Sequence, residues 1–111
     1  MAKYSDRLDR TFSALADPTR RAILGRLRSG PASVGELSEP FDIALPTLLK
    51  HVRVLEESGL VSSEKIGRVR TCRIETDALR AGEEWLRQHV AGWELRLDRL
   101  ERHIKRKKEE H

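Results

Sequence analysis

Six large apolar residues near the carboxyl end form the most restrictive pattern in this 111-residue sequence. They follow one another at alternating separations of four and three positions, at Leu86, Val90, Trp93, Leu97, Leu100 and Ile104. This heptad spacing places all of them on one side of an α-helix. Such a stripe extends beyond the roughly 30 Å or less of helix that the core of so short a chain could cover. It therefore predicts a long final helix, at about 77–104, that pairs with a second copy instead of packing only on its own core.

Two further helices are predicted in the first 30 residues. The first is expected between Ser5, a candidate N-cap, and Ala16, because its apolar residues have helical spacing: Leu8, Phe12 and Leu15. Asp17 and Pro18 then start a second helix. Aspartate caps helices well, and proline has no amide hydrogen to lose at the first helical position.

A helix-turn-helix is predicted at about 33–58. Ser33 and Glu36 have the spacing of a capping box and open a short helix. After a turn, a second helix starts near Pro46 and ends at Gly59, which suits the left-handed conformation of a C-terminal cap. The stripe of this helix that is expected to face inward is Leu45, Leu48, Val52 and Leu55.

The apolar pattern changes from helical to β-prone after Leu60. Two short runs, 61–66 and 69–74, flank Gly67 and Arg68, which predicts a β-hairpin at about 61–75. The predicted fold is therefore mainly α with a small β-hairpin. It is a winged helix-turn-helix with a long C-terminal dimerisation helix, and residues 1–111 form one domain.

Basic residues gather on the predicted recognition helix and hairpin. The formal net charge of +4 permits nucleic-acid binding without demonstrating it. No acidic residue occurs from 43 to 55, or between Glu64 and Glu75. A helix without acids can enter a groove walled by phosphates, so we expect this surface to bind double-stranded DNA. The predicted DNA-binding residues are Pro46, Thr47, Lys50, His51, Arg53, Lys65, Arg68 and Arg70.

Different roles are expected within this set. Thr47 and Lys50 lie in the N-terminal half of the recognition helix, the half that reaches base edges. His51 and Arg53 are expected to contact phosphates, and Arg68 to reach a phosphate or the minor groove from the hairpin tip. Helical spacing also places Val54 on this outward face.

Three stretches resemble the ArsR/SmtB family of winged-helix regulators, namely 12–24 with Asp17-Pro18-Thr19-Arg20, 50–61 with Leu55-Glu56-Glu57-Ser58-Gly59-Leu60-Val61, and Gly67-Arg68. The resemblance covers roughly residues 8–100. It implies a homodimeric repressor of an inverted-repeat operator, often released by an effector, which would here be an unknown small molecule or protein. It also implies dimerisation through the first and last helices. The predicted interface residues are Leu8, Phe12, Leu15, Leu86, Val90, Trp93, Leu97 and Leu100.

The chain departs from the family pattern in two respects. Family members often carry serine where this chain has Ala44 and Leu49. Leu49 either contacts a thymine methyl or packs inside, and packing is the favoured interpretation. The familiar metal-binding patterns are also missing, so we predict no metal site and no cofactor. The positions where ligands would be expected hold Ser33, Val34, Gly35, Leu79, Val90 and Trp93.

The remaining features are plain. Cys72 is the only cysteine, which excludes an internal disulfide. We interpret it as a packing residue in preference to a redox sensor. No catalytic motif is present, so the chain is not expected to be an enzyme. No run resembles a signal peptide or a membrane span, so we expect a cytoplasmic protein. The alternative function is a winged-helix protein–protein interaction module without specific DNA binding.

Overall fold

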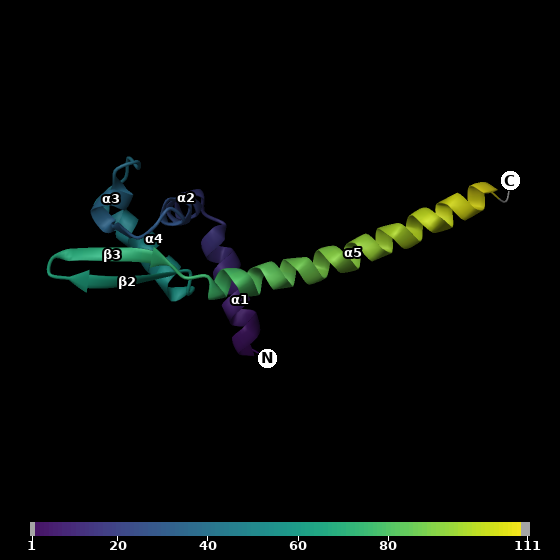
Figure 1. Cartoon of the computed structure of the whole chain (residues 1–111), viewed down its shortest axis with the longest axis horizontal. Helices are drawn as coiled ribbons and strands as arrows, with labels where there is room; N and C mark the ends of the chain where they lie inside the picture. Colours follow the sequence, from purple (N-terminus) through teal and green to yellow (C-terminus); the bar gives the residue numbers. More distant parts are fainter. Residues whose placement is uncertain (1, 110–111) are drawn as a thin grey trace.

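A small body and one long projecting helix make up the computed structural model, which describes the backbone of residues 2–109 and the side chains of residues 6–109 (Figure 1). Because the last helix leaves the body, the molecule measures 75 × 33 × 22 Å. The order of elements is α1 (Ala2–Leu15), α2 (Pro18–Leu27), β1 (Ala32–Ser33), α3 (Val34–Ser38), α4 (Leu45–Glu57), β2 (Val61–Ile66), β3 (Val69–Ile74) and α5 (Asp77–Glu109).

Two of the predicted helix starts have the expected capping bonds. The Asp17 carboxylate accepts a hydrogen bond from the backbone amide of Arg20 at 3.0 Å, with Pro18 next to the cap. Ser33 and Glu36 form a complete capping box, in which each side chain accepts from the other residue's amide. Ser5 does not cap the first helix, because α1 begins at Ala2 and Ser5 lies inside it.

The hairpin is the predicted wing, and a third strand joins it. Strand β3 pairs antiparallel with β2 on one side and with the two-residue β1 on the other, where Ala32 lies opposite Cys72. A strand of two residues has no alternating pattern, so β1 was not predicted from the sequence. Gly67 supplies the positive φ of +64° at the tip, and Arg68, the second residue of the two-residue turn, has a negative φ. This combination is typical of a type II′ turn.

The core lies between α1–α4 and the inner face of the sheet. Its fully buried side chains include Ile23, Leu37, Leu48, Leu55 and Cys72. Burial raises the pKa of the Cys72 thiol, and the nearby Glu56 carboxylate raises it further. The interpretation of Cys72 as a packing residue is therefore confirmed.

Two assignments on α4 were wrong. Leu45 was expected to face inward but is 51 % exposed, because α4 meets the core only from Leu48 onward. Val54 was expected to face outward but packs against the core, because α1 lies along that side of α4. The exposed face of α4 is consequently rotated away from α1 and towards the wing.

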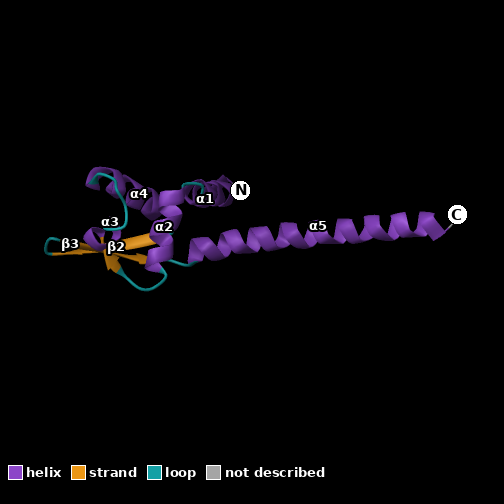
Figure 2. Cartoon of the chain, turned by 90° about the horizontal axis from the view of Figure 1, so that it is seen from above, coloured by secondary structure: helices purple, strands orange, loops and turns teal. Residues whose placement is uncertain are grey.

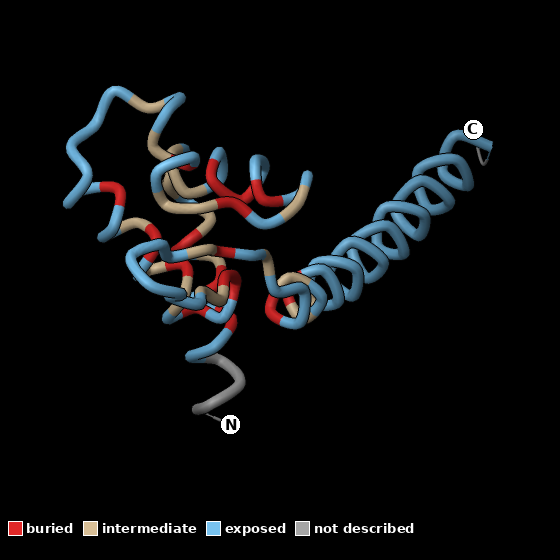
Figure 3. The backbone as a smooth tube through the Cα atoms, turned by 60° about the vertical axis from the view of Figure 1, so that its left-hand side comes forward, coloured by how far each residue is buried: buried red, intermediate tan, exposed pale blue. Residues whose placement is uncertain are grey.

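Only the start of α5 touches the body. Ala78 and Gly82 are buried, and the methyl group of an alanine at Gly82 would lie 3.7 Å from the Phe12 ring of α1. From Leu86 to Glu109 every described residue is exposed, and the helix leaves the body as a free rod (Figures 2 and 3). The six residues of the apolar stripe are 44–61 % exposed. The body of the same chain therefore leaves the stripe uncovered.

The described helices include none with both the length and the apolar character needed to cross a membrane.

Candidate nucleic-acid interface

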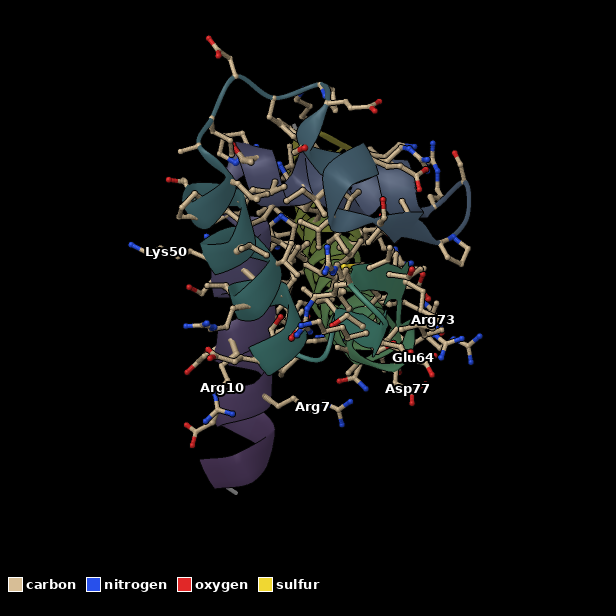
Figure 4. All side chains as sticks on the ribbon, turned by 90° about the vertical axis from the view of Figure 1, so that its left-hand side faces the viewer. Arg7, Arg10, Lys50, Glu64, Arg73 and Asp77 are labelled. Carbon is tan, nitrogen blue, oxygen red and sulfur yellow. The ribbon has the colours of Figure 1, made fainter. Side chains whose placement is uncertain are left out.

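An exposed stripe of five residues runs along α4. Spacings of three and four residues bring them to one side of the helix, and all are exposed: Leu45, Pro46, Leu49, Lys50 and Arg53. The ammonium group of Lys50 points away from the body (Figure 4). Thr47 is also exposed but lies one turn before His51, on the flank of α4 that carries that histidine. The structure thus brings three predicted DNA-binding residues, Pro46, Lys50 and Arg53, onto one surface with two leucines.

His51 has local partners inside the protein. Its ring is half-buried, and its Nδ1 lies 3.2 Å from Nη1 of Arg20 and 3.8 Å from Oδ2 of Asp17. The amide of Arg20 chiefly lowers the pKa of the Asp17 carboxyl, against a smaller rise from burial, and the nearby His51 lowers it further. His51 therefore joins α4 to the start of α2 and does not extend from the exposed stripe.

The wing is tied to α4 by a short polar network. Ser63 on β2 donates a hydrogen bond of 2.6 Å to the Glu56 carboxylate of α4. Arg70 on β3 donates one of 2.8 Å to the Ser63 hydroxyl, and its guanidinium lies 3.9 Å from Glu56. These contacts hold the wing beside α4. They also engage one of the predicted DNA-binding residues, Arg70, which nevertheless stays exposed.

The other basic residues of this surface have no acidic partner. Among the side chains that the structure describes, no ion pair involves Lys50, Arg53, Lys65 or Arg68. All four are exposed, two on α4 and two on the wing. Two unneutralised elements lie side by side, so an anionic polymer could contact both at once.

A groove of about 640 Å³ lies where α3, the start of α4 and the wing meet. Five of its lining residues carry apolar side chains and three are basic: Val34, Ile43, Leu45, Leu49 and Val69, with Lys65, Arg68 and Arg70. Leu49 is 39 % exposed in this groove. The expectation that Leu49 packs inside was therefore wrong, because α3 is too short to cover this side of α4.

Arg10 of α1 is a residue that the sequence analysis missed. It extends on the same side of the molecule as Lys50 (Figure 4). Both Arg10 and Glu57, the last residue of α4, line one pocket of about 660 Å³. The heptad-like spacing of α1 had directed attention to its apolar residues, and only the folded arrangement brings its polar face next to α4.

The α1 residues predicted for the dimer interface already have partners within the chain. Leu8 is 7 % exposed, and Phe12 packs edge-on against Trp85 of α5 with 5.5 Å between the ring centroids. Leu15 is half-buried against the core. The α5 residues of the same prediction are open, as described above. In the described part of the chain, no cluster of three His, Cys, Asp or Glu side chains is arranged to hold a metal ion.

Comparison with known proteins gives a consistent family. The profile of the helix-turn-helix domain family matches residues 15–64. The transcriptional repressor SdpR of Bacillus subtilis is 29 % identical over 79 residues, which span 71 % of this chain and 88 % of that protein.

Solved structures agree. The crystal structure of an ArsR family transcriptional regulator is 54 % identical with a TM-score of 0.80, over 85 % of this chain and 97 % of that one. A homodimeric winged helix-turn-helix DNA-binding domain from Mycobacterium bovis, a possible ArsR-family regulator solved by NMR, is 29 % identical with a TM-score of 0.66, over 85 % and 86 % of the two chains. This chain is a winged helix-turn-helix protein and belongs to the ArsR family of transcriptional regulators.

Proposed function

We propose that this protein is a homodimeric repressor that binds an inverted-repeat operator in double-stranded DNA. The observation that carries the proposal is the pairing of an acid-free, exposed stripe on α4 with a basic wing at its side. The similarity to the repressor SdpR and to the homodimeric M. bovis domain supports both parts of it. The relative SdpR is a bacterial protein, and a regulator that acts on bacterial DNA works in the cytoplasm, which is the location we propose.

The basic residues take different roles in this proposal. Lys50 reads base edges in the major groove, and Arg53 contacts a phosphate from the next turn of α4. Lys65 and Arg68 contact the backbone or the adjacent minor groove from the wing. His51, with its partners at Asp17 and Arg20, positions α4 on α2 and adds no phosphate contact of its own.

The second copy is proposed to cover the apolar stripe of α5. An antiparallel pair of α5 helices, with its two-fold axis between Ala91 and Gly92, sets the central apolar residues of the stripe against one another and Glu83 against the second copy's Leu100. Leu86 then faces the second copy's Leu97, and Val90 faces its Trp93. The first halves of the two α5 helices would form a four-helix interface with both α1 helices, because α1 packs on the start of α5.

Charge favours this register. Beside the core, Arg87 comes opposite the second copy's Glu94, and Arg80 comes opposite its Glu101, each twice by symmetry. A parallel pair would instead set Glu83 of one copy against Glu83 of the other in the core. The antiparallel pair therefore gains four attractive contacts and avoids one repulsive one.

Cysteine cross-linking tests this orientation. The double variant Leu86→Cys/Leu97→Cys is expected to form disulfide-linked dimers under mild oxidation, while each single variant stays unlinked. In the antiparallel pair, identical positions 86 lie roughly 16 Å apart along the axis, since each residue adds about 1.5 Å and a disulfide spans less than about 7 Å between Cα atoms. Efficient cross-linking of the single Leu86→Cys variant would show a parallel pair instead.

DNA binding is tested by selecting ligands from a random duplex pool and following affinity from 50 to 200 mM salt. We expect an enriched inverted repeat whose affinity falls by about 10³–10⁵ over that range if ~6–10 phosphates are contacted. Lys50→Ala should relax sequence preference, and Arg68→Ala should weaken binding to all sequences alike. Arg73→Ala is the matched control, because Arg73 lies on the other side of the molecule from Lys50 (Figure 4). Failure to enrich any sequence would refute the proposal and favour a protein-interaction module.

A further inference from the structure

We propose that Leu45 and Leu49 determine part of the operator sequence by contacting the C5-methyl groups of thymines. The inference rests on the proposed function and deepens it, since it names a chemical feature of the half-site. Both leucines lie on the exposed stripe of α4, one turn apart, and they flank Pro46 and Lys50. They are 51 % and 39 % exposed in the chain.

The position of the two leucines is unusual for exposed apolar side chains. They open onto the groove between α4 and the wing, with Ile43 and Val69 behind them, also 37 % and 52 % exposed. Nothing in the described chain covers this patch. An apolar cluster that stays exposed on the surface of a protein marks a binding site.

The charge around the patch narrows the choice of occupant. Three basic side chains of the wing line the same groove, Lys65, Arg68 and Arg70. No acidic residue lies between Ile43 and Leu55. The occupant must therefore combine negative charge with exposed apolar groups. DNA meets this description in its major groove, where the thymine methyl is the apolar group among the exposed base edges.

The leucines also restrict how α4 can read bases. Neither side chain donates or accepts a hydrogen bond, so two of the five exposed stripe residues contribute apolar contact only. The polar members that remain are Lys50 and Arg53. We therefore infer a half-site in which Lys50 addresses a guanine and one or two thymines lie next to it, beneath Leu45 and Leu49.

Replacement of thymine by deoxyuridine tests the inference, because it deletes the methyl group and keeps the hydrogen-bonding edge. The probe is the operator duplex selected from the random pool, with each half-site thymine replaced in turn in both half-sites. One buried methyl is worth about fourfold in Kd, so a symmetric pair should cost the wild-type protein about 15-fold. In the Leu49→Ser variant, at least one symmetric replacement should raise Kd by less than about twofold, since the contact between Leu49 and the thymine methyl is already missing.

Matched variants separate this effect from general damage. Leu95→Ser changes a leucine that is 59 % exposed on α5, so it should keep the full sensitivity of the wild type. Leu45→Ala provides a second recognition-helix variant in case Leu49→Ser folds poorly, and should lose sensitivity at a different thymine. Dodecanoate, a probe for an amphipathic acid in the same groove, should leave operator affinity unchanged.

The outcomes distinguish the inference from the proposed function. If no operator is enriched, the proposed function itself has failed. The inference is overturned if an operator is found but its half-sites lack thymine, or if deoxyuridine lowers affinity equally in wild type, Leu49→Ser and Leu45→Ala. Displacement of the operator by dodecanoate from wild type but not from Leu49→Ser would assign the groove to a small ligand and overturn it as well.

Discussion

Shortening Leu97 to alanine is expected to raise the dissociation constant of the dimer by about 10- to 80-fold. Burying a whole leucine side chain is worth about 1.5–3 kcal/mol, and Leu97 is 44 % exposed in the single chain. Covering that fraction in both copies contributes about 1.3–2.6 kcal/mol to the dimer, which corresponds to the stated range. The cavity that the shorter side chain leaves between the two α5 helices would add to this loss.

Sedimentation equilibrium over a dilution series measures the dissociation constant. Leu95→Ala is the matched control, because Leu95 is 59 % exposed on the same helix but lies two positions away from Trp93 and Leu97 of the apolar stripe. Its dissociation constant should stay within about threefold of the wild type. Equal effects of Leu95→Ala and Leu97→Ala, or no effect of either, would refute the assignment of the stripe to the dimer.

Three further predictions concern the body of the protein. Asp17→Ala should lower the thermal midpoint above pH 4 by removing the cap of α2. The pKa of the Asp17 carboxyl is lowered below 3.8 in the folded chain, so the stabilisation by this carboxylate is present above pH 3.8 and is lost as the pH falls through the folded-state pKa. The thermal midpoint of the variant should therefore approach that of the wild type in acid. A constant difference between the two midpoints at all pH values would contradict this. Cys72 should react with a thiol reagent more than about tenfold slower in native than in denatured protein, since burial raises its pKa and blocks access; equal rates would show that the strand opens. Arg70→Ala should weaken operator binding even with the fold intact, because it removes the guanidinium that contacts both Ser63 of the wing and Glu56 of α4. Unchanged affinity with unchanged thermal stability would show that this guanidinium has no part in binding.

Local signals predicted the elements of this fold well. The Asp17-Pro18 start, the Ser33–Glu36 capping box and the Gly67-Arg68 turn each depend on bonds within three or four residues, and the structure has all three. The long α5 was also foreseen, although it continues to Glu109 instead of ending near residue 104. Its exposed basic and acidic end has no apolar pattern from which a boundary could be read.

Features that depend on distant parts of the chain were harder to predict. The outward face of α4 was misjudged because a single helix shows its apolar spacing but not what covers each flank. Here α1 covers Val54, while Leu45 and Leu49 are left open beside the wing. Likewise, the ring of His51 is engaged by Asp17 and Arg20, more than 30 residues earlier in the chain. Contacts of this kind are properties of the packed body and leave no periodic mark in the sequence.

Two copies of the protein are proposed to read two half-sites on the same face of the DNA. The most direct test compares the selected operator with a version that carries five extra base pairs between its half-sites. This insertion rotates one half-site by about half a turn of the helix, since one turn takes about 10–10.5 base pairs. Affinity is expected to fall to that of a single half-site. Unchanged affinity after the insertion would show that the copies bind independently, and the dimeric repressor would have to be abandoned.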